Sequence, residues 1–197
     1  MSDISRRFFE TLQRRPVIAA LRRAGEVEEA TRHGAAILFI LGGDIFALRE
    51  SAAAARASGR PLLAHVDLIK GIGRDEAGIR FLARDLGVDG VLTTRANLIG
   101  PAKREGLLAI QRLFVLDSES LEAGLPSVER ATPDAVEVLP GVILPLIAER
   151  LRQASLPPLI AGGLIRTREQ VLAALQAGAV GVSTSERSLW AFQAGAR

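Results

Sequence analysis

The stretch Pro158-Leu159-Ile160-Ala161-Gly162-Gly163-Leu164-Ile165-Arg166 predicts a strand that runs into a glycine turn. A helical segment follows, and Ala179-Val180-Gly181-Val182-Ser183-Thr184-Ser185 then predicts a second strand that ends in hydroxyl residues. Strands that alternate with helices in this way pair in parallel and are joined by right-handed crossovers. The rest of the chain repeats the same unit, so this stretch decides the fold class.

Eight short apolar segments rich in β-branched residues recur along the chain, with helical patterns between them. Eight consecutive βα units close naturally into an α/β barrel of the TIM (β/α)8 type, which we predict. The alternative, a doubly wound open sheet, is favoured by a G-x-G-x-x-G turn after the first strand, where this chain reads Arg22-Arg23-Ala24-Gly25. Pro126 is expected to interrupt its helix. The strands are expected to start near Pro16, Ala35, Leu62, Gly90, Leu107, Ala135, Leu159 and Ala179.

Several helical patterns end in a glycine that suits a left-handed C-cap, namely Gly34, Gly59, Gly87, Gly106 and Gly178.

The length of 197 residues suits one compact domain, with an N-terminal helix over residues 1–15 and the barrel over residues 16–197. The segment Asp3–Arg15 is amphipathic, because Ile4, Phe8 and Leu12 share one helical face. We expect this helix to plug the bottom of the barrel or to pack beside it.

Composition excludes several classes of function. The chain has no cysteine and only two histidines, His33 and His65, so a thiolate or histidine-rich metal site is impossible and no metal or cofactor is predicted. No apolar run approaches the roughly 18 residues of a membrane span, and the N-terminus lacks a signal peptide's apolar core. We therefore expect a cytoplasmic protein. The net charge of +3 is weak evidence for nucleic-acid binding.

The last two βα units carry the pattern of a phosphate site. In (β/α)8 barrels the loops after the final two strands commonly bind phosphate, because backbone N–H groups and a helix N-terminus converge there. Glycines let an anion approach the backbone, Arg166 lies at the mouth of a helix, and Thr167 with Gln170 matches a capping box. A tight turn and ordinary capping are the alternative interpretation. The predicted phosphate residues are Gly162, Gly163, Arg166, Ser183, Thr184 and Ser185.

Two further strands carry acids on faces that we expect to point into the barrel. Alternation places His65 and Asp67 on one face, so Asp67 is a candidate acceptor for ligand hydroxyls, or else forms an internal pair with Lys70 or His65. Glu137 stands between two valines and needs a buried partner, for which Arg95 and Arg112 are candidates.

The chain lacks a recognisable nucleophile. It has no cysteine, and no G-x-S-x-G motif accompanies His65. The polar interior therefore favours binding over catalysis.

Six strings of sequence together form a recognisable pattern. They are His65-Val66-Asp67-Leu68-Ile69-Lys70-Gly71, Thr94-Arg95, Ala109-Ile110-Gln111-Arg112-Leu113-Phe114-Val115-Leu116-Asp117, Glu137-Val138-Leu139-Pro140-Gly141, Ala161-Gly162-Gly163-Leu164-Ile165-Arg166 and Ser183-Thr184-Ser185. The pattern resembles the glycerol-3-phosphate-responsive antiterminators, bacterial regulators of the glycerol uptake operon. The resemblance runs from about Pro16 to Trp190. It implies a TIM-like barrel that binds glycerol 3-phosphate and acts on leader mRNA in transcription antitermination, without catalysis.

The resemblance assigns the phosphate to the glycine turn, Arg166 and the final hydroxyls. It assigns the glycerol hydroxyls to Asp67 and Glu137, and the predicted polar interior also includes Lys70, Arg95, Arg112 and Gly141. The RNA surface stays unassigned. A homo-oligomer is compatible with the pattern.

The paired arginines Arg6-Arg7, Arg14-Arg15 and Arg22-Arg23 suit phosphate contacts or a solvated surface. Two alternative functions remain at this point. One is an enzyme acting on a small phosphorylated polyol or triose, and the other is a barrel that binds a ligand and only a protein partner.

Overall fold

Eight parallel strands close into a barrel in the order in which they occur in the chain, with β1 paired to β8. This computed structural model describes residues 3–23 and 25–193. The predicted (β/α)8 barrel is confirmed, and the alternative of an open sheet is wrong. The strands are β1 (Val17–Leu21), β2 (Leu38–Ile40), β3 (Leu62–His65), β4 (Gly90–Thr93), β5 (Leu108–Phe114), β6 (Ala135–Leu139), β7 (Leu159–Gly162) and β8 (Ala179–Thr184).

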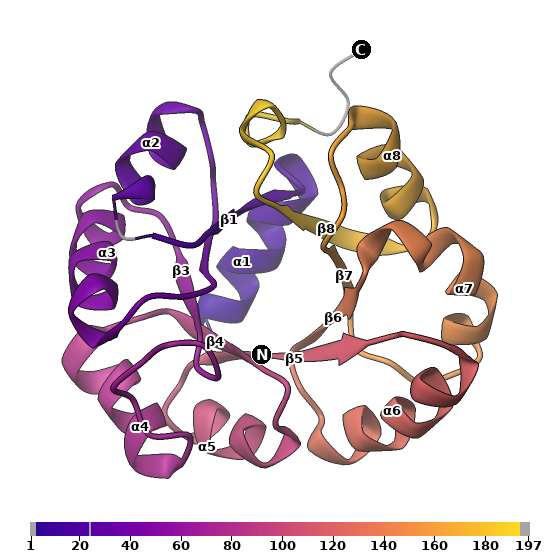
Figure 1. Cartoon of the computed structure of the whole chain (residues 1–197), viewed down its shortest axis with the longest axis horizontal. Coiled ribbons are helices and arrows are strands. Elements are labelled where there is room, and N and C mark those ends of the chain that lie inside the picture. Colours follow the sequence, from indigo (N-terminus) through magenta and orange to yellow (C-terminus); the bar gives the residue numbers. More distant parts are fainter. Residues whose placement is uncertain (1–2, 24, 194–197) are drawn as a thin grey trace.

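The helices that follow β1 in the chain form an outer ring around the strands, as Figure 1 shows. Single turns extend or precede some of them: η1 (Leu82–Leu86), η2 (Ala96–Leu98), η3 (Gly141–Ile143) and η4 (Arg187–Leu189). No helix in the described ranges combines the length and apolarity that a membrane crossing requires. The helices are α1 (Asp3–Arg14), α2 (Glu26–Arg32), α3 (Ile45–Ala57), α4 (Glu76–Phe81), α5 (Ile99–Arg104), α6 (Ser118–Ala131), α7 (Leu144–Arg152) and α8 (Arg168–Gln176).

Most element boundaries follow the sequence pattern. The strand β2 begins at Leu38 rather than Ala35, because the Ala35 N–H donates to Ala30 O and still belongs to the end of α2. Pro126 does not interrupt α6, which buries Leu125 and Val128 on either side of it and is held in place by that packing. All the predicted C-cap glycines have positive φ: Gly34, Gly59, Gly87, Gly106 and Gly178.

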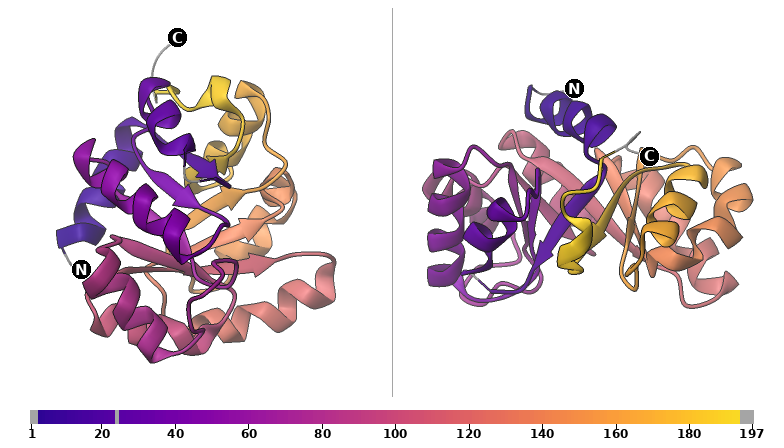
Figure 2. Two further views of the ribbon diagram at one scale, coloured as in Figure 1. Left: turned by 60° about the vertical axis from the view of Figure 1, so that its left-hand side comes forward. Right: turned by 90° about the horizontal axis from the view of Figure 1, so that it is seen from above.

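The barrel has two apolar cores. One lies between the strands and the surrounding helices, and the other fills the barrel's interior. Phe8 and Leu12 of α1 belong to the interior core together with Ile18 and Phe39 from the first strands. The helix α1 therefore closes the end of the barrel where the strands begin, and Figure 2 shows it lying across that end. The polar residues of the interior therefore lie toward the opposite end of the barrel, where the strands end.

Candidate functional site

A cavity of about 290 Å³ opens at the carboxyl ends of the strands. It lies at the junction of β1, β5 and β8 with the loop that follows β7. Six of the predicted site residues line it, namely Gly163, Arg166, Ser183, Thr184, Ser185 and Arg112, together with Ala20, Arg22, Leu41, Leu139, Leu164, Ile165 and Glu186. The structure thus brings half of the predicted set to one cavity.

A buried acid organises the floor of this cavity. Glu137 of β6 is fully buried, and Arg112 of β5 donates from Nε to its Oε2 at 2.6 Å. Ser183 of β8 donates to the other carboxylate oxygen at 2.5 Å. Both oxygens of Glu137 thus have partners that line the cavity. The acid fixes the orientation of a guanidinium and a hydroxyl, and this arrangement confirms the predicted pairing of Glu137 with Arg112.

The glycine turn after β7 serves two different purposes. A Cβ on Gly162 would stand 2.3 Å from Glu137 Oε1, so this position must be glycine to admit the acid. Gly163 has φ of +83° and lines the cavity, and Leu164 follows in the same left-handed region. Only Gly163 therefore presents its backbone to the cavity in the way the sequence predicted for both glycines.

The entry to α8 has the predicted capping box. Thr167 accepts from the Gln170 N–H, and Gln170 Oε1 accepts from the N–H groups of Thr167 and, at 2.7 Å, of Arg166. The box orders the chain at the cavity's rim, so Arg166 is held at the mouth of the helix.

The three hydroxyls at the end of β8 have separate partners. Ser183 donates to Glu137, whereas Thr184 donates to Ile165 O at 2.6 Å and ties β8 to the loop after β7. Thr184 Oγ1 also accepts from the Glu186 N–H. Ser185 is exposed on the cavity lining. The prediction that all three hydroxyls bind phosphate is therefore too simple, because Ser183 and Thr184 form hydrogen bonds within the protein that fix the cavity lining.

Asp67 forms a second polar cluster, with residues from the end of β4. It accepts from Thr93 Oγ1 at 3.0 Å and from the Thr94 N–H at 2.7 Å, and Arg95 Nε lies 3.4 Å from Oδ1. Arg95 was predicted to join Arg112 and Glu137, and this is wrong. β3 and β4 are neighbours in the sheet, whereas β4 and β6 are separated by β5.

Two predicted residues contribute through the backbone. Lys70 is exposed, and its N–H and carbonyl bond to Gly43 O and the Ile45 N–H, which joins the loops after β2 and β3. Gly141 donates its N–H to Gly163 O at 3.1 Å, and a Cβ there would be 2.7 Å from the Gly162 nitrogen. Both residues position loops around the barrel's mouth.

His65 is a neutral group in the interior. Its burial, and then the positive charge of Arg112, lower its pKa from 6.5 to about 4. Its Nδ1 lies 3.9 Å from Asp67 Oδ2. Within the part of the chain that the structure describes, no group of three or more His, Asp or Glu side chains is placed to hold a metal ion.

Arg22 is the cavity residue that sequence reasoning assigned elsewhere. It follows β1, and the closure of β1 onto β8 brings it to the same cavity as Arg112 and Arg166. Three guanidinium groups around a small cavity favour an anion, because arginine donates paired hydrogen bonds to phosphate and carboxylate oxygens. The sequence feature that could have identified Arg22 is its position immediately after a barrel strand, where ligand-binding residues are common.

Comparison with known proteins gives consistent similarities over nearly the whole chain. The model of the family described as glycerol-3-phosphate responsive antiterminator matches residues 17–190. A protein of Escherichia coli K12, described as the uncharacterized protein YgcP, is 33% identical over 182 residues, covering 91% of this chain and 93% of its own.

Two solved structures are similar as well. The glycerol uptake operon antiterminator regulatory protein from Listeria monocytogenes superimposes with a TM-score of 0.82 at 34% identity, covering 88% of this chain and 94% of its own. A glycerol uptake operon antiterminator-related protein from Thermotoga maritima gives a TM-score of 0.79 at 31% identity, covering 91% and 99%. The residues that the family model matches, 17–190, include every residue that lines the cavity.

Proposed function

Because the chain belongs to the glycerol-3-phosphate responsive antiterminator family, we propose that it is a ligand-controlled regulator of transcription. It binds glycerol 3-phosphate in the cavity at the carboxyl ends of its strands. In the bound form it acts on the leader mRNA of glycerol uptake genes, so that transcription continues past a terminator.

The observation that carries the ligand assignment is the convergence of Arg22, Arg112 and Arg166 on one cavity of about 290 Å³. The volume lies near the lower limit of small-molecule sites, which suits a three-carbon phosphate ester. We assign the phosphate to Arg166, the Gly163 backbone and the Ser185 hydroxyl, all of which line the cavity. This is the position at which (β/α)8 barrels commonly bind phosphate.

The glycerol end of the ligand is assigned to the floor of the cavity. Arg112 and Ser183 line the cavity, and both donate hydrogen bonds to the buried carboxylate of Glu137. Asp67, with Arg95 beside it, supplies a further polar group at the mouth of the barrel. A fixed set of hydrogen-bonding groups in an otherwise apolar wall provides orientation and specificity.

The same contacts favour binding over turnover. Both carboxylate oxygens of Glu137 already accept hydrogen bonds, from Arg112 and Ser183. Burial lowers the pKa of His65 to about 4. A general base needs a pKa near the working pH, which His65 lacks. Regulation by binding is therefore the function that this cavity supports best.

The test is a gel-mobility titration of a terminator-forming glycerol operon leader RNA with this protein. It is done with glycerol 3-phosphate, with glycerol, and without addition. We expect glycerol 3-phosphate alone to tighten RNA binding. A parallel assay follows the concentration of glycerol 3-phosphate over time. Consumption of the compound with unchanged RNA affinity would favour an enzyme on a phosphorylated polyol and overturn the proposal.

A further inference from the structure

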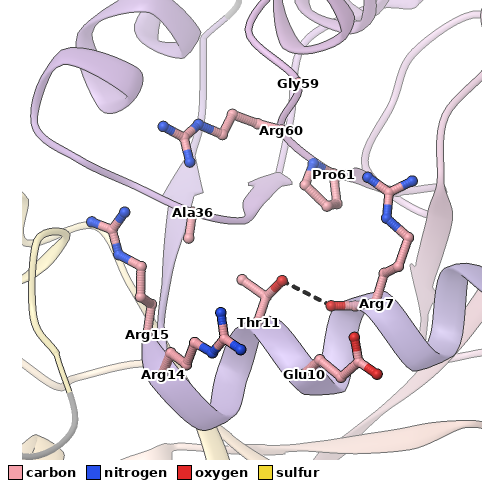
Figure 3. Close-up of a pocket in the computed structure, with 9 residues that line it drawn as sticks. All are labelled: Arg7, Glu10, Thr11, Arg14, Arg15, Ala36, Gly59, Arg60 and Pro61. Atoms are coloured by element: carbon pink, nitrogen blue, oxygen red, sulfur yellow. Dashed lines mark hydrogen bonds between the residues drawn. The ribbon is translucent and has the colours of Figure 1, made fainter.

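A second cavity, of about 360 Å³, lies at the opposite end of the barrel from the ligand cavity. It is bounded by α1 and by the segments that lead into β2 and β3. Figure 3 shows the arginines that surround it, Arg7 and Arg14 on α1, Arg15 directly after it, and Arg60 before β3. The other lining residues are Glu10, Thr11, Ala36, Gly59 and Pro61.

Within the described residues these four arginines lack the close salt bridges that other surface arginines have, although the charge of Asp89 acts on Arg7. Elsewhere on the surface, Arg84 pairs with Glu105, Arg104 with Glu76 and Arg150 with Glu122. None of the four cavity arginines forms such a salt bridge with a carboxylate in residues 3–23 or 25–193. Glu10 is the one acid among the lining residues. The cavity therefore carries a net positive charge.

Two donors in this cavity also lack partners. Arg15 donates from its terminal nitrogen to Gly34 O, but its Nε is buried without a hydrogen bond among the described residues. The Nε of Arg60 is buried without one in the same part of the chain. Because these two Nε atoms are buried, the donors that a ligand can reach on these side chains are the terminal guanidinium nitrogens. Oxygens of a phosphate fit guanidinium donors best.

The basic surface is longer than a single anion requires. An adjoining cavity shares Arg7, Gly59, Arg60 and Pro61 with the first and adds Arg56 and one acid, Asp89. Arg7 and Arg14 lie about 10 Å apart along the helix axis, since each residue rises about 1.5 Å. A continuous groove of this length suits a chain of phosphates rather than one small ion. We call it the arginine groove, defined by Arg7, Arg14, Arg15, Arg56 and Arg60.

We propose that the arginine groove binds the phosphodiester backbone of RNA. The inference rests on the proposed antiterminator function and assigns its RNA surface. No aromatic side chain lines either cavity, so the groove has no platform for base stacking and contributes affinity rather than sequence reading. Its place at the amino ends of the strands leaves the ligand cavity free while RNA is bound.

The test compares two double variants of the full chain that each remove two positive charges. Arg7→Gln/Arg14→Gln changes exposed side chains of the groove, and Arg49→Gln/Arg130→Gln changes exposed side chains of α3 and α6. Affinity for the leader RNA is measured between 50 and 200 mM salt. Removing one arginine that neutralises a phosphate lowers the slope of log affinity against log salt by about 0.7 to 0.9. The groove variant should bind RNA about tenfold or more weakly than wild type, with a slope smaller by about 1.5.

The outcomes separate the two proposals. Equal RNA affinities for the two double variants, with wild-type protein binding RNA, overturn the groove but leave the antiterminator function. Absence of RNA binding by wild-type protein overturns both. Stabilisation by inorganic phosphate that only the groove variant loses, with unchanged RNA affinity, would show a small-anion site and overturn the RNA assignment. The melting shift with glycerol 3-phosphate should be equal in both variants, which confirms that the ligand cavity is intact.

Discussion

Gly162 lies directly against the carboxylate of Glu137, so that a Cβ on the glycine would stand 2.3 Å from Oε1. The carboxylate has little freedom to move, because Arg112 and Ser183 hold its two oxygens. Overpacking of a closed interior costs about 1–3 kcal/mol. We expect Gly162→Ala to lower the free energy of unfolding in urea by an amount in this range.

Gly25→Ala is the matched control for that substitution. Gly25 has φ of −66° and open space around a Cβ, so its replacement should change stability little. Equal urea midpoints for the two variants would show that the interior adjusts freely around Glu137.

This glycine also shows how far the sequence predicts the site. The sequence indicated that Gly162 and Gly163 admit a phosphate, and only Gly163 lines the cavity. Local sequence reveals that a residue lacks a side chain, but not which atom occupies the space. That depends on β6 and β7 lying side by side, with Glu137 paired to Ile160 in register.

Arg22 was missed for a related reason. Its place in the cavity follows from the closure of β1 onto β8, a contact between the two ends of the chain. Arg95 could have been placed correctly, since the strand order alone makes β3 the neighbour of β4 and so brings Arg95 to Asp67. The fold could be predicted because apolar strand segments and helix-capping glycines recur along the chain. The prediction that Pro126 interrupts its helix was wrong, because the packing of α6 on the barrel outweighs the local preference of proline.

The ligand cavity predicts a difference between glycerol 3-phosphate and glycerol. Ligand at a hundred times its dissociation constant adds about 2.7 kcal/mol to stability, which raises the melting temperature. Glycerol should have little effect, because it lacks the phosphate that we assign to Arg166, Gly163 and Ser185. Similar shifts with both compounds at equal concentration would contradict the phosphate assignment.

The guanidinium groups of the rim should account for much of that affinity. Arg166→Ala and Arg22→Ala each remove a charge-assisted hydrogen bond worth about 1.5–3 kcal/mol, and we expect at least a tenfold rise in the dissociation constant by calorimetry. Arg152→Ala, on the outer helix α7, should bind like wild type. A variant of Arg166 or Arg22 with wild-type affinity would remove that residue from the site.

The buried pair of Arg112 and Glu137 should behave as one unit. Removing one partner leaves an uncompensated buried charge and costs about 3–5 kcal/mol, whereas replacing both with apolar residues is often nearly neutral. We expect Arg112→Met to be strongly destabilising and Arg112→Met/Glu137→Leu to recover part of the loss. The double variant should nevertheless lose the melting shift with glycerol 3-phosphate. Additive losses in the double variant would show that the two residues act independently.

His65 makes stability depend on pH in a defined window. Its pKa is lowered to about 4 in the folded protein from 6.5, mainly by burial and then by Arg112. As pH falls below 6.5 the unfolded chain binds the proton first, so this contribution is complete above pH 6.5 and is lost as pH falls toward 4. The full loss is about 3 kcal/mol at about 1.36 kcal/mol per pKa unit.

Urea unfolding from pH 7 to pH 4 measures this effect. His65→Gln should flatten the curve relative to wild type, and His33→Gln, which removes an exposed imidazole, is the matched control. Parallel pH curves for His65→Gln and wild type would mean that the imidazole has the same pKa in the folded and the unfolded chain.

The two ends of the barrel are joined by β8. Leu12 of α1 packs on Gly181, where a Cβ would be 3.0 Å from Leu12 Cδ2, and Ser183 two residues later enters the ligand cavity. The helix that carries Arg7 and Arg14 thus touches the strand that lines the ligand cavity. We expect this contact to couple the two ends, because a shift of β8 on ligand binding would move α1. By thermodynamic linkage, the factor by which glycerol 3-phosphate tightens RNA binding must equal the factor by which RNA tightens ligand binding.

We therefore expect Leu12→Ala to reduce this coupling factor toward one while each partner alone still binds. Deleting a buried leucine costs about 2–5 kcal/mol of stability, so the control is Leu125→Ala, which truncates a leucine buried under α6 on the outer side of the barrel. The measurement is RNA titration with and without saturating glycerol 3-phosphate for wild type and both variants. A coupling factor that Leu12→Ala leaves intact would show that the signal reaches the RNA surface by a route other than the contact between α1 and β8.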